Sequence, residues 1–309
     1  MTRSARLKAF AKLNLGLRVL FRRPDGYHEL RTVFQTISLA DDLTVEVERA
    51  RSTQIDIEGA PHIPDNLVGK AARLVLDALR MQARVRFTLR KKIPAGAGLG
   101  GGSTDAAAVL LALPVLAGKN LPAEQLHSIA TQLGSDVPFF LHGGTALGLG
   151  RGEELYPLPD RPATRALLVA PGIHSSTVEA YRDLSPRLTS IPLQNKLVSF
   201  QQEVWHATGA VVENDFEEVV FARHPELRRV KERIRRLGAR PVAMTGSGSA
   251  IFGVFEDRDR LKRAQAAFTR ENAFGISFLS RSQYRSVWRR TLKQHMEGDQ
   301  WPPRSLYAR

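Results

Sequence analysis

Alternating apolar and polar positions near the N-terminus predict a β-strand. In KAFAKLNLGLRVL (8–20), every odd position from 9 to 19 is apolar, and Lys12, Asn14 and Arg18 stand between them. This period of two is typical of a strand with one buried face. It places Lys12 and Asn14 next to each other on the less apolar face. The same alternation predicts strands in LTVEVE (43–48), QIDIE (54–58) and VRFTL (85–89).

Segments with helical periodicity lie between and after these strands. NLVGKAARLVLDAL (66–79) predicts a first helix, and a second is expected to start near Ser103. Pro114 should kink or end that second helix, because proline lacks the N–H that a helix interior needs. PAEQLHSIATQLG (122–134) predicts a third helix that ends at Gly134.

The pattern starts again after a proline-containing boundary at DRPAT (160–164). Strands are predicted at 165–170, at 274–280 and, as a pair joined by a turn, within 241–255. Helices are predicted over 176–183, 210–221, 225–237 and 257–270. Strands and helices mix without a regular βαβ alternation, so the expected fold class is α+β. We expect two domains, 1–160 and 161–285, followed by a basic, partly disordered tail, 286–309.

Composition narrows the class of protein. Hydrophobic residues make up 43% and charged residues 25% of the 309 residues, the balance of a soluble globular protein. No apolar run reaches the roughly 18 residues that a membrane span needs, and the N-terminus lacks the apolar core of a signal peptide. The absence of cysteine excludes disulfides and thiolate metal sites and agrees with a cytoplasmic location.

The net charge of +14 allows two interpretations. Residues 222–309 hold 20 Lys and Arg against 8 Asp and Glu, and such a surface could bind nucleic acid. Alternatively it is a solvated face whose potential attracts a polyanionic small substrate. No helix-turn-helix, zinc or RNA-binding motif is present, and in RRVKERIRRLG (228–238) three apolar residues recur at helical spacing: Val230, Ile234 and Leu237. This amphipathic pattern favours the solvated face.

The stretch IPAGAGLGGGSTDAAAVL (93–110) carries the clearest chemical signal. It places five glycines in seven positions, namely Gly96, Gly98, Gly100, Gly101 and Gly102. The Walker A pattern fails because Gly102 stands where the lysine belongs. The dinucleotide pattern G-x-G-x-x-G matches, but the context fails because a second helix follows instead of a strand. The protein-kinase version needs a valine at the position of Ser103.

The physical chemistry of this stretch still indicates a phosphate site. Glycines allow positive φ angles and close approach, and successive backbone N–H groups can form an anion-binding nest. The helix that follows adds unpaired N–H donors and the positive end of its dipole. Ser103 and Thr104 suit an N-cap or a metal-bound hydroxyl, and Lys91 and Lys92 add positive charge. The alternative is a merely flexible turn.

Four other polar features have both a structural and a functional interpretation. Asp136 in GSDVPFF either caps a short helix or points its carboxylate at a substrate hydroxyl. Tyr27 and His28 in DGYHEL are either structural or stack on and hydrogen-bond to a base. TGSGSA (245–250) is either a tight hairpin or a second backbone wall against a ligand. Lys12 is either a surface lysine or a charge beside the chemistry.

Five segments in order along the chain resemble the GHMP kinase superfamily over about residues 8–282. They are AKLNLGL (11–17), DGYHELRTVFQTI (25–37), IPAGAGLGGGSTDAAAVL (93–110), GSDVPFFLHGGTALGLGRGE (134–153) and TGSGSAIFGVF (245–255). The resemblance implies a ribosomal protein S5 domain 2-like N-terminal domain, a ferredoxin-like C-terminal domain and an active site in the cleft between them. It also implies ATP as the phosphoryl donor, with Mg²⁺, whose ligands it does not identify.

The resemblance also implies roles for residues that match the family's motifs. Asp136 matches the catalytic aspartate and Lys12 the lysine beside it. Asn14 and Thr177 are expected near the substrate, and Tyr27 and His28 around a cytosine ring. The donor nucleotide would contact Asn66 at its adenine, and the glycine stretch would wrap its phosphates with Pro94, Gly96, Gly98, Gly100, Gly101, Gly102, Ser103 and Thr104.

AKLNL together with DGYHEL points to one branch of the superfamily. In that branch the acceptor is the 2-hydroxyl of a cytidine-diphosphate derivative of methylerythritol, in the non-mevalonate isoprenoid pathway. The alternatives are a GHMP kinase acting on another small alcohol and, from a different class, a basic nucleic-acid-binding protein. We therefore expect a small-molecule substrate, no nucleic-acid or membrane partner, and either a monomer or a homodimer.

Overall fold

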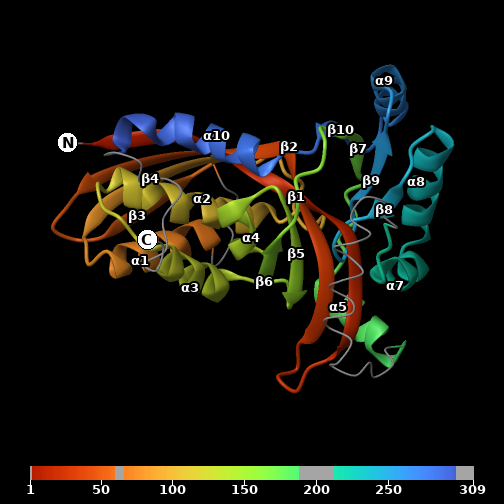
Figure 1. Ribbon diagram of the computed structural model, residues 1–309, viewed down its shortest axis with the longest axis horizontal. Helices are drawn as coiled ribbons and strands as arrows, with labels where there is room; N and C mark the ends of the chain where they lie inside the picture. The colour runs from red at the N-terminus through yellow and green to blue at the C-terminus, as the bar shows by residue number, and fades with distance from the viewer. Residues whose placement is uncertain (1, 60–65, 188–211, 297–309) are drawn as a thin grey trace.

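The computed structural model describes residues 2–59, 66–187 and 212–296. These residues form two units, each built on one sheet (Figure 1). In the six-stranded sheet of the first unit the strand order is β3-β4-β2-β5-β6, and β1 pairs with β2. Its strands are β1 (Arg3–Arg22), β2 (His28–Arg49), β3 (Gln54–Glu58), β4 (Ala83–Arg90), β5 (Thr145–Gly150) and β6 (Glu154–Pro157).

Helices pack on the sheet of the first unit and bury its main core. They are α1 (Leu67–Ala78), α2 (Gly101–Leu116), α3 (Ala123–Leu133) and α4 (Val137–His142). Every residue of α2 from Thr104 to Leu116 is buried. This central helix therefore has a fixed N-terminus, and the glycine stretch leads directly into it.

The second unit has a four-stranded antiparallel sheet in the order β10-β7-β9-β8. Its strands are β7 (Arg165–Ala170), β8 (Val242–Met244), β9 (Ile251–Phe255) and β10 (Asn272–Ser277). Its described helices are α5 (Thr177–Leu184), α7 (Phe216–Arg223), α8 (Pro225–Arg236) and α9 (Arg258–Ala267). This βαββαβ order is the ferredoxin-like arrangement.

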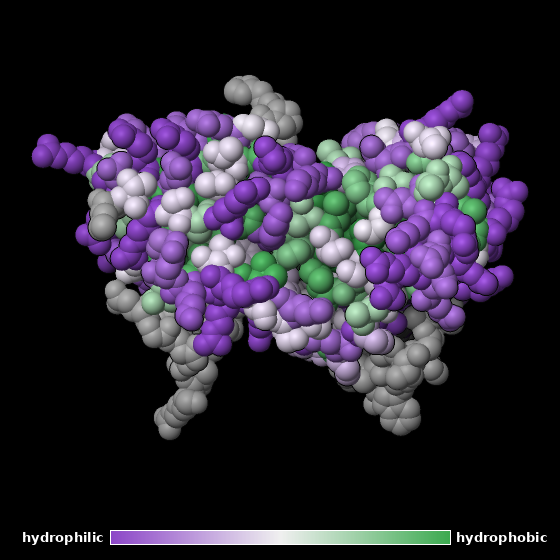
Figure 2. All heavy atoms as spheres, turned by 90° about the horizontal axis from the view of Figure 1, so that it is seen from above, coloured by the Kyte–Doolittle hydropathy of each residue, from purple (hydrophilic) through white to green (hydrophobic). Residues whose placement is uncertain are grey.

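Strand β1 joins the two units because its odd-numbered residues contribute to three successive cores. Leu7 belongs to the core of the first unit, Leu13 to the core between the units, and Leu17 to the core of the second unit. Shifts in register with β2 between Phe10 and Lys12 and between Asn14 and Gly16 accompany these changes of partner. In Figure 2, hydrophobic side chains gather in the narrow middle of the molecule between two hydrophilic ends.

Most predicted elements are confirmed, some within a residue. The strands at 54–58 and 165–170 have the predicted bounds, and the α+β class holds. Helix α2 continues two residues beyond Pro114, so the proline ends it later than expected. The helix predicted over 210–221 starts only at Phe216, because Asn214 pairs with Leu17 in a parallel bridge instead. Residues 210–211 lie outside the described part.

The region expected to be a basic tail is structured as far as residue 296. Helix α10 (Arg281–Leu292) and a short 3₁₀ turn (Lys293–His295) return to the first unit, where Tyr284, Trp288 and Leu292 enter its core. Residues 286–296 are therefore an ordered part of the first unit and not a separate tail. Residues 297–309, with Trp301, lie outside the described part.

The basic surface of the second unit follows the amphipathic pattern. Ile234 is fully buried, and Val230 and Leu237 pack against the same core. The arginines of α8 consequently lie on its outer side, as predicted. No helix among the described residues is long and apolar enough to cross a membrane.

Candidate active site

A cleft of about 790 Å³ lies where the two units meet, and it brings together residues from distant parts of the chain. Nine of the predicted site residues line it: Lys12, Asn14, Tyr27, His28, Gly98, Gly100, Ser103, Asp136 and Thr177. They come from β1, the start of β2, the glycine stretch, α4 and α5. The structure therefore gathers these nine predicted residues around one continuous cleft.

Lys12 and Asp136 face each other at the centre of this cleft. Lys12 Nζ lies 3.5 Å from Asp136 Oδ2 and 2.5 Å from Asn14 Oδ1. The Asn14 amide donates a 2.7 Å hydrogen bond to Thr32 Oγ1. Both Lys12 and Asn14 are 3% exposed, so they are not on a half-solvated strand face as the alternation suggested. Their hydrogen bonds satisfy the polar groups that this burial would otherwise leave unpaired.

Asp136 occupies the N-cap position of α4 without capping it. Its side chain makes no hydrogen bond to the backbone of that helix. The carboxylate points instead toward Lys12, and about a third of its side chain is exposed. The geometry thus excludes the capping interpretation and leaves a carboxylate open to the cleft.

The glycine stretch bends into the N-terminus of α2 through left-handed backbone conformations. Gly96, Gly98 and Gly100 have φ of 64°, 75° and 71°. Gly100 is the N-cap, and no side chain caps the helix, so Ser103 and Thr104 are inside its first turn and not at its cap. The first N–H groups of α2 therefore keep no side-chain acceptor, as an anion-binding helix start requires.

The neighbour that excludes side chains from Gly98 is another backbone. A Cβ at Gly98 would lie 2.4 Å from the Thr245 carbonyl oxygen, in the TGSGSA segment of the second unit. Asn14 N donates to Thr245 Oγ1 at 2.9 Å in the same place. TGSGSA is thus a second wall of the cleft, and Gly246 and Ser247 line it.

Six residues predicted to contact the phosphates or the adenine are not among those that line the cleft. They are Asn66, Pro94, Gly96, Gly101, Gly102 and Thr104. Asn66 caps α1 by accepting from Val68 N at 3.0 Å, and Thr104 is 1% exposed. Gly101 and Gly102 form the first turn of α2 beside Ser103.

Lys91 and Lys92 are engaged with carboxylates behind the glycine stretch. Lys91 contacts Asp41 and lies 2.7 Å from Asp105, and Lys92 Nζ lies 2.8 Å from Asp42. Burial raises the pKa of Asp105 to about 7, with the charge of Asp41 adding to the rise and Lys91 opposing it. The positive charge expected from Lys91 and Lys92 is therefore largely neutralised before it reaches a ligand.

Aromatic side chains line the far end of the cleft. Tyr27 is 56% exposed. His28 stacks on Tyr181 with ring centroids 4.7 Å apart, and His28 Nε2 lies 2.8 Å from Ser185 Oγ. Burial lowers the pKa of His28, and the charge of Arg22 lowers it further, which favours the neutral imidazole. A planar group with polar edges suits such a pocket.

Sequence reasoning missed Thr32, Arg151 and Tyr181, and it included Ser247 only as part of the possible second wall TGSGSA. All four line the cleft. Thr177 Oγ1 lies 2.8 Å from Ser247 Oγ, which links the start of α5 to TGSGSA. Thr32, Arg151 and Ser247 lie inside segments that carry the family resemblance, and Tyr181 does not. Nothing in the spacing of the four residues shows that they meet.

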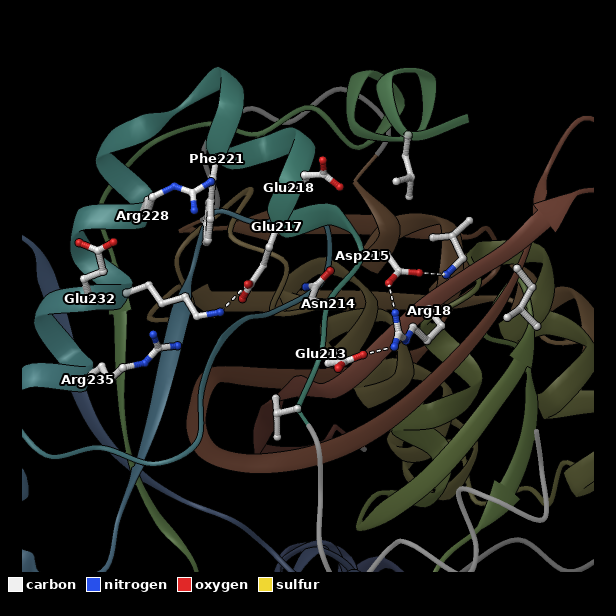
Figure 3. A pocket seen from close by; sticks show the side chains of 15 residues that line it. Arg18, Glu213, Asn214, Asp215, Glu217, Glu218, Phe221, Arg228, Glu232 and Arg235 are labelled. Carbon is white, nitrogen blue, oxygen red and sulfur yellow. Dashed lines mark hydrogen bonds and ion pairs between the residues drawn. The ribbon is translucent and has the colours of Figure 1, made fainter. Parts of the chain in front are cut away.

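A second hollow of about 850 Å³ lies on the second unit, between β1 and α8 (Figure 3). Four cations and five carboxylates line it, so its charges roughly balance. Arg18 contacts Glu213 and Asp215, and Lys231 contacts Glu217. In the cleft, by contrast, four cations, Lys12, Arg22, Arg151 and Arg182, face one lining carboxylate, Asp136. The cleft is thus the better site for a polyanion.

Comparison with known proteins agrees with this geometry. The family model for the GHMP kinases N terminal domain matches residues 66–144, and that for the GHMP kinases C terminal matches residues 197–273. A homoserine kinase from Cytophaga hutchinsonii has the same fold, with a TM-score of 0.68 at 18% identity over 90% of this chain and 95% of its own. The chain belongs to the GHMP kinases.

Two further relatives are more similar to this chain, and both are named for the same kinase. A protein of Solibacter usitatus named 4-diphosphocytidyl-2-C-methyl-D-erythritol kinase is 54% identical over 99% of this chain and 98% of its own. A crystal structure of 4-(cytidine 5'-diphospho)-2C-methyl-D-erythritol kinase has a TM-score of 0.73 at 41% identity and covers 90% of this chain and 99% of its own.

Proposed function

We propose that the protein transfers the γ-phosphoryl group of ATP to the 2-hydroxyl of 4-diphosphocytidyl-2-C-methyl-D-erythritol, in the non-mevalonate isoprenoid pathway. The observation that carries this proposal is the single cleft that contains the Lys12–Asp136 pair, an uncapped helix N-terminus and an aromatic pocket. The 54% identity to a kinase named for this acceptor supports the choice of substrate.

The phosphate tail of ATP would lie against the glycine stretch and the first turn of α2. Backbone N–H groups at Gly101, Gly102 and Ser103 supply donors, and the helix dipole adds positive potential. This arrangement needs no lysine in the loop, which agrees with the pairing of Lys91 to Asp41 and Asp105.

The residues at the cleft are compatible with Mg²⁺. The described ranges contain no group of three or more Asp, Glu or His side chains placed to hold a metal. Mg²⁺ at kinase sites, however, is usually held by substrate phosphates, waters and one or two protein ligands. Ser103 lines the cleft in the first turn of α2, and its hydroxyl would be such a ligand. When bound, the ion would neutralise negative charge on the phosphates.

The Asp136 carboxylate would orient the acceptor hydroxyl and take its proton. An aspartate is a weak base at neutral pH, so we propose that the proton leaves late and that alignment contributes more than basicity. The Lys12 ammonium would stabilise the charge of Asp136 and of the transferring phosphoryl group. Asn14 fixes Lys12 through the 2.5 Å hydrogen bond.

The cytidine end of the acceptor would occupy the aromatic pocket. Tyr27 offers an exposed ring for stacking, and the neutral imidazole of His28 can hydrogen-bond to a base edge. Arg22 and Arg182 line the same cleft and suit the acceptor's diphosphate. Small alcohols such as homoserine or mevalonate would leave these groups unused.

An ATP-consumption assay with alternative acceptors tests the proposal. We expect turnover with 4-diphosphocytidyl-2-C-methyl-D-erythritol at least about a hundredfold faster than with mevalonate or homoserine, since buried polar recognition groups reject analogues that lack their partners. Faster turnover of a small alcohol would identify a different GHMP kinase. Steeply salt-dependent nucleic-acid binding without ATP turnover would favour the other class. The cytoplasmic location and the oligomeric state stay predictions.

A further inference from the structure

Tyr27 needs a support, because it stands at the tip of the hairpin between β1 and β2. Its backbone is fixed by two hydrogen bonds, from Tyr27 N to Asp25 Oδ1 at 3.1 Å and from Arg23 N to Tyr27 O at 2.7 Å. Its ring, 56% exposed, has no such constraint of its own. A free ring would lose rotamer entropy whenever a base stacked on it.

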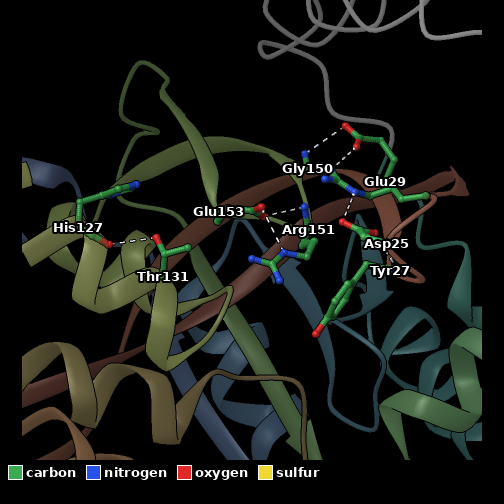
Figure 4. Close-up of polar contacts among 9 residues, drawn as sticks. Asp25, Tyr27, Glu29, His127, Thr131, Gly150, Arg151 and Glu153 are labelled. Carbon is green, nitrogen blue, oxygen red and sulfur yellow. Dashed lines mark hydrogen bonds and ion pairs between the residues drawn. The ribbon is translucent and has the colours of Figure 1, made fainter. Parts of the chain in front are cut away.

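Arg151 supplies a contact to that ring from a different part of the sheet. The guanidinium carbon of Arg151 lies 4.8 Å from the centre of the Tyr27 ring, within cation–π range (Figure 4). Arg151 is held in turn by Glu153, whose carboxylate accepts from Arg151 N at 2.7 Å and from Arg151 Nε at 3.3 Å. One face of the Tyr27 ring is thus covered by a restrained cation.

A buried carboxylate fixes the distance between the two turns. Glu29 is 2% exposed, and its Oε2 accepts from Arg23 Nη1 at 2.9 Å while its Oε1 accepts from Gly150 N at 3.2 Å. Arg23 belongs to the turn that carries Tyr27, and Gly150 immediately precedes Arg151. Since a buried carboxylate holds its donors strongly, Glu29 ties the two turns together, as Figure 4 shows.

We propose that Arg151 is a positioning residue for the acceptor. Its guanidinium holds the Tyr27 ring from one side and leaves the opposite face for the base. Arg151 would therefore raise affinity for the cytidine part of the acceptor and would have no part in phosphoryl transfer. This inference rests on the proposed function, because it assigns Arg151 a role in binding that acceptor.

The test compares Arg151→Gln, Arg151→Lys and Glu153→Gln with the wild type. Arg86→Gln is the matched control. Arg86 lies on β4, away from the cleft, and like Arg151 it is a partly exposed arginine close to glutamates, here Glu46 and Glu58. We expect Arg151→Gln to raise KM for the acceptor about five- to tenfold, with kcat and KM for ATP within about twofold of wild type. Arg151→Lys should restore part of the loss, and Glu153→Gln should cause a smaller loss of the same kind.

Titration with cytidine and with cytidine monophosphate separates positioning from a direct phosphate contact. Positioning predicts that Arg151→Gln weakens both ligands by the same factor, because the loss acts through the base. A loss confined to the phosphorylated ligand, an unchanged affinity for both, or a fall in kcat alone would overturn the proposal. If the wild type bound no cytidine nucleotide, the proposed function itself would fail, which is a different result.

Discussion

Lys12 Nζ lies 3.5 Å from Asp136 Oδ2 and joins the long first strand to the start of α4. The two side chains differ in access to solvent, since the Lys12 side chain is buried and the Asp136 side chain is 33% exposed. Only the carboxylate can therefore touch a substrate hydroxyl readily. In the proposed mechanism, the Lys12 ammonium contributes charge from behind the carboxylate. This division of roles is the basis of the mechanism proposed above.

Replacing Asp136 by Asn should abolish most catalysis without weakening nucleotide binding. We expect kcat to fall about 10²- to 10⁴-fold, the usual contribution of a positioned acid–base group. The dissociation constant of an ATP analogue should stay within about threefold, because the proposed triphosphate contacts lie on α2 and not on Asp136. Asp56→Asn, on the exposed face of β3, is the matched control. Near-normal kcat in Asp136→Asn would remove the carboxylate from the mechanism.

Tyr27→Ala should affect the acceptor and not the donor. Loss of an exposed stacking surface predicts a KM for the cytidine substrate about tenfold higher or more, since stacking of a base on an aromatic ring contributes roughly 1–3 kcal/mol. Steady-state kinetics with each substrate varied in turn would measure this, with KM for ATP as the internal control. An unchanged acceptor KM would place Tyr27 outside the binding site.

The contact between the two glycine-containing segments predicts a stability effect at Gly98. In Gly98→Ala, the new methyl group would sit on a backbone with φ of +75° and would lie 2.4 Å from the Thr245 carbonyl oxygen. Gly172 has φ +78° but nothing within 4 Å, so Gly172→Ala measures the backbone strain alone, about 1–2 kcal/mol. Gly98→Ala should lower the free energy of unfolding by about 1–3 kcal/mol more than Gly172→Ala. Equal losses in chemical denaturation would show that the contact is not restrictive.

The buried carboxyl group of Asp105 should make the free energy of unfolding depend on pH. Burial raises its pKa from 3.8 to about 7 in the folded state, so between those pH values the folded chain holds a proton that the unfolded chain has released. Stability therefore falls as pH rises through this range. Asp105→Asn cannot titrate, so the free energy of unfolding of wild type minus that of the variant should decrease from about pH 4 to about pH 7. A constant or increasing difference would mean that Lys91 keeps Asp105 ionised throughout.

Local patterns in the sequence predicted the elements that depend on local physics. The strands at 54–58 and 165–170 alternate or run apolar over their whole length, and the glycine stretch showed its positive φ angles through composition alone. The chemistry of Asp136 and Lys12 came from the family resemblance, since the spacing of Asp136 alone slightly favoured a helix cap. The structure separates these interpretations because the side chain faces Lys12.

Features that depend on distant contacts were not predictable in the same way. The first half of β2 was missed because polar residues such as Gln35 and Asp41, which are buried and hydrogen-bonded there, interrupt its apolar pattern. Helix α10 carried a usable signal in Tyr284, Trp288 and Leu292, spaced four residues apart, but its arginines resembled a solvated tail. Arg151 and Tyr181 reach the cleft only through the packing of both units.

A crystal structure of the protein with a non-hydrolysable ATP analogue would test the proposed phosphate site most directly. We expect the triphosphate against the N–H groups of Gly101, Gly102 and Ser103, with the γ-phosphate directed at the space between Lys12 and Asp136. A triphosphate bound elsewhere, for instance in the hollow beside Arg228 and Arg235, or a terminal phosphate directed away from Asp136, would contradict it.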